Sequence, residues 1–177
     1  MCLVYLLSHL SDMMGSEEMN LHELLTSAKL TNIKINAKFA SLEFKMNTVD
    51  KDAAWEMYVE LITRILTQNL EYEDGDEKTA LDSVYSLFPT TRDILKRNGR
   101  ECIQFSKIAV VVLNQIVRPF TAKWHRKELQ GAFSDKSECN AFRNDLQKLQ
   151  INLRKYSALL ARLAEVEDIT ALEKVEE

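Results

Sequence analysis

The chain has 177 residues, enough to bury a core without help from disulfides or metal ions. Its formal charge of −4 argues against a general nucleic-acid binder, and three cysteines without a CxxC pair argue against a disulfide framework or a four-ligand zinc site. Four Gly and two Pro are too few for a turn-rich β-sandwich or barrel. We therefore expect a mainly α protein of the reducing cytoplasm that needs neither a cofactor nor a metal.

The first 18 residues show no sustained period, whereas Met19 opens the helix-like stretch MNLHELLTSAKL. The early run CLVYLL has no preceding positive charge and is far shorter than the ~20 apolar residues of a membrane span, so neither a signal peptide nor a span is expected. We interpret residues 1–18 as a flexible extension or as residues upstream of the true start, 19–167 as one helical domain and 168–177 as an acidic, solvated tail. Met1 and Met19 remain alternative native starts.

Residues 32–47, NIKINAKFASLEFKMN, alternate apolar and polar side chains with period two, which is the signal of a strand. A slip of phase at Ala40 and Ser41 leaves either a bulged strand or a short β-hairpin. An isolated pair of strands is only marginally stable. The segment must therefore lie against helices or pair with a second chain, and the second alternative would make a dimer.

A helical pattern begins at Asp50, which we expect to be the N-cap of the first long helix. Its apolar residues recur at intervals of three and four, which places them on one buried face: Ala54, Trp55, Tyr58, Leu61, Ile62, Ile65 and Leu66. Asp76 can cap the next helix, and Gly99 lies just beyond the end of its stripe. Because a proline inside a helix removes a hydrogen bond, Pro89 predicts a kink or break near Phe88.

The third helix is predicted over about residues 101–130 and contains IAVVVLNQIV, which is apolar on nearly every side. A fourth helix carries an a/d heptad seam formed by Phe142, Leu146, Leu149, Leu153, Tyr156, Leu160 and Leu163. Since three amphipathic segments precede it, packing within one chain is favoured over a zipper between two chains. The sequence thus predicts a core like a four-helix bundle.

The stretch RPFTAKWH, residues 118–125, lies in the third helix if that helix continues past Pro119. At about 100° per residue, one face then carries Leu113, Ile116, Val117, Phe120 and Trp124, which we expect to be buried. The opposite face carries Lys107, Asn114, Arg118, Ala122 and His125. Arg118 and His125 would lie roughly 10 Å apart on this exposed stripe, and a two-fold dimer could bring a second pair close to them.

Arg118 and His125 resemble the signature of the HEPN family (higher eukaryotes and prokaryotes nucleotide-binding), in which an Arg precedes a His by a few residues on a helix of an all-α bundle. Many members are metal-independent ribonucleases with a composite site across a dimer. The resemblance implies that Arg118 stabilises the phosphate and that His125 is the acid or base for attack by the ribose 2′-hydroxyl. It covers eight residues, and Pro119 departs from the polar residue that usually follows the Arg.

A simpler interpretation of the same stretch is a helix end whose cations complement the helix dipole. These cations, together with Lys107 and Asn114, also form a candidate binding surface: Lys123, Arg126 and Lys127. Separately, AWEMYVELITRI, DSVYSLFPTTRDIL and RPFTAKWH, within residues 54–125, are similar to segments of uncharacterised small helical bacterial proteins. That similarity implies a bacterial origin and no particular activity.

The sequence contains no GxxxxGK[ST], GxGxxG, HExxH or GxSxG motif and no motif specific for DNA. Our preferred hypothesis is therefore an intracellular helical bundle that binds a protein partner or itself, without chemistry of its own. The alternative is a HEPN-like, metal-independent ribonuclease, a toxin or antiviral effector that uses Arg118 and His125. RNA is accordingly the second candidate partner.

Overall fold

The computed structural model describes residues 20–30, 33–34, 44–68, 70 and 75–170, and the structural statements below concern this part of the chain. Its long helices are α4 (Thr48–Ile62), α5 (Glu77–Tyr85), α6 (Leu87–Asn98), α7 (Ile103–Val112), α8 (Arg118–Glu128) and α9 (Lys136–Leu163). A short helix, α2 (Leu21–Ser27), precedes them. Three shorter turns connect them: η1 (Gly99–Glu101), the π-helical η2 (Leu113–Val117) and η3 (Ala132–Ser134).

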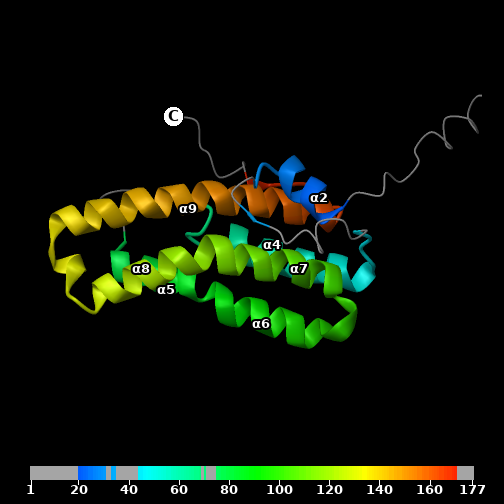
Figure 1. Ribbon diagram of the computed structural model, residues 1–177, viewed down its shortest axis with the longest axis horizontal. Helices are drawn as coiled ribbons and strands as arrows, with labels where there is room; N and C mark the ends of the chain where they lie inside the picture. The colour runs from blue at the N-terminus through cyan, green and yellow to red at the C-terminus, as the bar shows by residue number, and fades with distance from the viewer. Residues whose placement is uncertain (1–19, 31–32, 35–43, 69, 71–74, 171–177) are drawn as a thin grey trace, which may run out of the picture.

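The predicted mainly α fold with a four-helix core is confirmed. Helix α4 packs against α9, α6 and α7, while α5 packs against α8. Figure 1 shows α9 running along one side of the molecule, with α7 and α8 forming one continuous rod beside it and α6 on the far side of that rod. The largest fully buried side chains, which come from α4, α7, α8 and α9 among others, include Tyr58, Phe105, Trp124 and Phe142.

Helix α4 begins three residues earlier than the sequence suggested. Asn47, and not Asp50, is its N-cap, and Asp50 completes a capping box as the third helical residue. The prediction was wrong because Asp50 is fully buried and its carboxylate serves a second helix. Its Oδ1 accepts hydrogen bonds from the backbone N–H groups of Gln104 and Phe105, at 2.9 and 3.0 Å.

The second predicted stripe divides into α5 and α6. Asp76 caps α5 as predicted, accepting a 2.9 Å hydrogen bond from the backbone of Thr79. The predicted break near Phe88 is confirmed, because the chain leaves the α5 helix at Ser86 and Pro89 falls in the first turn of α6, where a missing N–H costs nothing. Gly99 ends α6 with φ of +70°, a conformation that side chains with a Cβ rarely adopt.

The third predicted helix does continue past Pro119, with a local change of winding. Residues of η2 form a π-helical turn, and the N–H of Arg118 bonds to the carbonyl of Leu113, five residues earlier. Such a turn accommodates one extra residue. Each side chain beyond the turn therefore points in the direction that an unbroken α-helix would give to the residue before it. The buried face of α8 therefore comprises Phe120, Thr121 and Trp124, while Leu113 and Ile116 are only half-buried.

The heptad seam of α9 is confirmed as an intramolecular contact. Phe142, Leu146, Leu149, Leu153, Tyr156 and Leu160 are all buried in the core of a single chain, and Leu163 is half-buried. Helix α4 is the main partner of this seam. The face predicted for α4 was wrong at Trp55, which keeps 46% of its surface exposed, and too long at its end, because Ile65 and Leu66 lie beyond the last helical residue, Ile62.

The strand or hairpin expected over residues 32–47 is not found in its described part, which is limited to residues 33–34 and 44–47. The backbone of Lys34 pairs instead with a side chain of η2: its N–H donates to Gln115 Oε1 and its carbonyl accepts from Gln115 Nε2, both at 2.7 Å. This amide supplies the two bonds that a neighbouring strand would have supplied. The rest of the segment lies outside the described residues.

The two predicted termini are only partly described. Residues 1–19 and 171–177 lie outside the described part of the chain, so the proposed extension and the choice between Met1 and Met19 remain predictions. Residues 165–169 are exposed, and only 168–170 of the predicted acidic tail are described. Residues 165–169 are nevertheless anchored, because Ile169 N donates to Tyr58 Oη at 2.7 Å and Glu165 pairs with Lys51 at 2.5 Å.

Candidate binding surface

Arg118 lies at the start of α8, on the side that faces α6. Its guanidinium carbon is 5.0 Å from the centroid of the Phe88 ring, a cation–π contact, and its Nε donates a 3.0 Å hydrogen bond to Asn114 Oδ1. The Arg118 side chain is exposed. Asn114, which was predicted to share a stripe with Arg118, therefore has a definite role, because its side-chain amide fixes the direction of the Arg118 guanidinium.

His125 lies two turns further along the same side of α8. Its ring meets that of Tyr85 edge-on, with centroids 5.1 Å apart and an interplanar angle of 89°. Its Nε2 is buried and has no hydrogen-bond partner within the described structure. The ring centroid of Tyr85 in turn lies 5.7 Å from that of Phe88. The structure therefore places Arg118 and His125 on one side of the helix, each against a different member of an aromatic pair.

Trp124 is fully buried, as predicted, and forms a three-ring cluster with Phe133 and Phe142. The ammonium groups of Lys123 and Lys127 lie 4.8 and 4.9 Å from the centroid of its ring. Both lysines also pair with carboxylates of α9: Lys123 with Asp145 and Lys127 with Glu138. These two candidate binding residues thus point toward α9, and their charges are already neutralised.

The remaining candidates lie on the outer side of the rod formed by α7 and α8. Lys107 is half-buried and donates to Gln104 Oε1 at 2.9 Å, and Arg126 is exposed. On α7, Lys107 stands between two exposed apolar residues, Ile103 and Val110, which are 54% and 44% exposed. Residues spaced by three and four share one helix face. The outer stripe of α7 is therefore both apolar and cationic.

Two further cations were missed by sequence reasoning. Arg92 follows Phe88 by four residues on α6, so it leaves that helix near the ring on which Arg118 rests, and Lys96 lies one turn further on. Both side chains are exposed. The net charge of this segment could have revealed them in the sequence. Residues 86–163 hold fifteen Lys and Arg against six Asp and Glu, although the whole chain carries −4.

We call the combined surface of α6, α7 and α8 the basic face, and define it by Arg92, Lys96, Lys107, Arg118 and Arg126. None of these five cations is paired with a carboxylate in the part of the chain that the structure describes. That distinguishes them from Lys123 and Lys127. A surface of unpaired cations beside exposed apolar side chains is suited to an anionic partner that also offers apolar contacts.

Two negative observations complete the description. Among the described residues there is no group of three or more His, Cys, Asp or Glu side chains placed to hold a metal ion. In the same part of the chain, no helix is both long and apolar enough to cross a membrane. Comparisons of the chain with models of protein families, with curated proteins and with solved structures found no match.

Proposed function

We propose that the protein acts by binding another protein, and that the basic face receives an acidic surface of that partner. The observation that carries this proposal is the set of five cations without carboxylate partners in the described structure, next to exposed Ile103 and Val110. Opposite charge would guide and orient the encounter, and the apolar side chains would supply contact area. The described cysteines, Cys102 and Cys139, are free, which supports action in the reducing cytoplasm.

A protein fits this surface better than RNA does. Nucleic-acid surfaces combine cations with aromatic side chains on which bases stack. On the basic face Phe88 is already covered by Arg118. Tyr85, on the neighbouring α5, is 51% exposed but is packed edge-on against His125, so it offers at most one stacking surface. The exposed apolar residues, Ile103 and Val110, are aliphatic. Aliphatic side chains between cations match a partner that carries apolar residues among its carboxylates.

The test is site-specific photo-crosslinking in cells that express the native gene. A benzophenone amino acid replaces Val110 on the basic face or, as the control, the similarly exposed Ile151 on α9. We expect a discrete protein adduct from position 110 alone, and we expect it to disappear when Arg92→Glu and Lys96→Glu are added. Adducts of equal yield from both positions, or an adduct that survives both charge reversals, would refute the proposal.

A second candidate function is a HEPN-like, metal-independent ribonuclease that uses Arg118 and His125. The observation in its favour is that both side chains lie on the same side of α8, where Arg118 belongs to the basic face. Its test is cleavage of bacterial total RNA by the purified protein in EDTA. Cleavage that is lost in both folded variants, Arg118→Ala and His125→Ala, supports the ribonuclease. If there is no cleavage, or if neither variant changes it, Arg118 and His125 have no catalytic role and only pack against Phe88 and Tyr85.

A further inference from the structure

Trp55 occupies an unusual position for the largest side chain of an otherwise well-packed helix. It is 46% exposed, whereas Trp124, the other tryptophan, is fully buried. Its ring packs beside that of Tyr58, with the two ring centroids 5.9 Å apart. Asp52 and Val59 precede and follow it by three and four residues and so share its outward stripe on α4.

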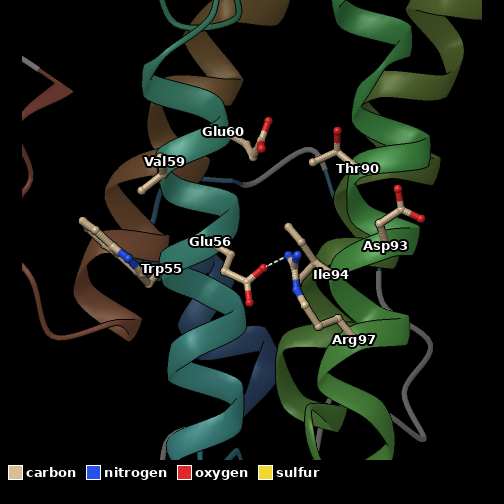
Figure 2. A pocket seen from close by; sticks show the side chains of 8 residues that line it. All are labelled: Trp55, Glu56, Val59, Glu60, Thr90, Asp93, Ile94 and Arg97. Atoms are coloured by element: carbon tan, nitrogen blue, oxygen red, sulfur yellow. Dashed lines mark hydrogen bonds and ion pairs between the residues drawn. The ribbon is translucent and has the colours of Figure 1, made fainter.

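A groove of about 400 Å³ lies between this stripe and α6. Figure 2 shows Glu56 and Glu60 pointing from α4 toward α6, while Trp55 and Val59 point away from it at the rim. The opposite wall comes from α6 and includes Asp93. Glu56 is paired with Arg97, and Glu60 is paired with Arg64. Asp93 has no cationic partner in the described structure, so the groove keeps an uncompensated negative charge.

The other flank of the α4 stripe is also acidic and partly apolar. Residues 165–170 are held there by the hydrogen bond from Ile169 N to Tyr58 Oη. This segment leaves Val166 and Ile169 36% and 41% exposed. Its carboxylates include Glu167 and Asp168, neither of which forms an ion pair within the described chain.

We call this surface the tryptophan face and define it by Trp55 and Val59 at its centre and by Asp52, Asp93, Glu167 and Asp168 around them. The centre is apolar, and the four rim carboxylates form no ion pair within the described residues. The cations nearby, Lys51 and Arg97, are already paired with Glu165 and Glu56. We propose that the tryptophan face binds an amphipathic helix of a partner protein, with the apolar side of that helix on Trp55 and Val59 and its Lys or Arg residues on the rim. A helix seated in a groove beside a half-exposed tryptophan is a recurrent mode of recognition.

The charge of the rim selects this occupant. An anionic helix or a nucleic acid would meet four carboxylates that form no ion pair with any described residue, and like charges brought together at an interface are strongly unfavourable. The inference does not depend on the function proposed above, because it concerns a different surface and the opposite charge. If both proposals hold, the protein joins an acidic partner and a cationic one.

The probe is a synthetic 18-residue helix of Leu and Lys, and its counterpart has Glu in place of every Lys. Because Trp124 is buried, the fluorescence of Trp55 reports occupancy of the face directly. We expect a saturable blue shift with the Lys peptide and none with the Glu peptide. Calorimetry should show about a tenfold loss of affinity for Trp55→Ala and for Asp52→Lys combined with Asp93→Lys. The control is Asp82→Lys, which reverses an exposed carboxylate on α5 and should leave affinity unchanged.

Three results would overturn the inference. The first is equal binding of both peptides, and the second is unchanged affinity in the Trp55 and Asp52/Asp93 variants. The third is a face that is already occupied, shown by poor quenching of Trp55 by acrylamide in the free protein. Sedimentation velocity then identifies the occupant. A dimer that Trp55→Ala converts to a monomer would mean that a second copy covers the face. A monomer in both the wild type and the variant would mean that another segment of the same chain covers it.

Discussion

The carboxylate of Asp50 on α4 lies 3.0 Å from the backbone nitrogen of Phe105 on α7, so a single buried side chain caps the starts of two helices. Its other oxygen accepts from the N–H of Asn47 at 3.2 Å. Helix α7 has no side-chain cap of its own, because Cys102 at its N-cap position forms none. Asp50 therefore satisfies N–H groups that the burial of this end would otherwise leave unpaired.

Replacing Asp50 by Ala should lower the free energy of unfolding by about 3 kcal/mol or more, because three backbone N–H groups lose their acceptor. Asp50→Asn should cost less, about 1–2 kcal/mol, since its remaining oxygen can still accept from α7. Urea denaturation measures both. Asp52→Ala, at an exposed position two residues away, should change stability by less than about 0.5 kcal/mol. Equal effects at the two positions would contradict the assigned role.

Tyr156 should make the fold sensitive to alkaline pH. Burial raises the pKa of its phenol above the ordinary value of 10, so the folded state resists the deprotonation that the unfolded state undergoes. Stability from this group is complete below pH 10 and falls above it, by up to about 1.4 kcal/mol per pH unit. Tyr156→Phe should flatten this loss in urea titrations between pH 9 and 11.

At neutral pH the same substitution should not destabilise the fold. The hydroxyl of Tyr156 is buried and has no hydrogen-bond partner in the described structure, so Phe removes a polar atom that gains nothing there. We expect stability at pH 7 to be unchanged or higher by up to about 1 kcal/mol. A clear loss at pH 7 would show that the hydroxyl is satisfied in solution. The pKa of Tyr58 is also raised, chiefly by burial, so some alkaline sensitivity should persist in the variant.

His125 offers a test that separates packing from catalysis. Its Nε2 is buried without a partner, while its ring packs edge-on against Tyr85. His125→Phe keeps a ring of similar shape and should raise thermal stability by up to about 1 kcal/mol. His125→Ala removes the ring and should lower it by about 1–2 kcal/mol. Any RNA cleavage that His125→Phe leaves intact would exclude the imidazole as the acid or base.

The hydrogen bond between Tyr58 and Ile169 should govern the opening of residues 165–170. Tyr58→Phe removes the acceptor of the Ile169 N–H, so the amide of Ile169 should exchange with solvent about fivefold faster. Amides in the middle of α9 should keep their protection. The matched control is Tyr85→Phe, because Tyr85 is exposed on α5 and lies outside this contact. Unchanged exchange at Ile169 would mean that other contacts hold the segment.

The sequence supported those features that depend on neighbours along the chain. The heptad seam of α9, the cap at Asp76 and the break before Pro89 were all predicted correctly, because each follows from side-chain spacing or from the backbone chemistry of one residue. The face of α4 was predicted less well. Ala53 and Met57 complete its buried side, which turns Trp55 outward, and an alanine gives little signal in a hydrophobic pattern.

The candidate site depended on contacts that the sequence does not encode locally. Lys123 and Lys127 resemble Arg118 and Arg126 in the sequence, yet the carboxylates of α9 neutralise only the two lysines. Phe88 and Tyr85 come from helices earlier in the chain and decide how Arg118 and His125 are held. Such relationships require the folded arrangement, and pattern analysis of one helix at a time cannot supply them.

The π-helical turn at η2 also has a consequence for the chain length that this rod tolerates. Because it holds one residue more than an α-helix would, α8 keeps its buried Trp124 in line with the buried Phe105 of α7 despite the surplus. A chain one residue shorter between positions 113 and 117, with a residue other than proline at 119, would join α7 and α8 in an unbroken α-helix with the same faces. The turn is thus the point in this rod where the chain could lose one residue without moving the basic face.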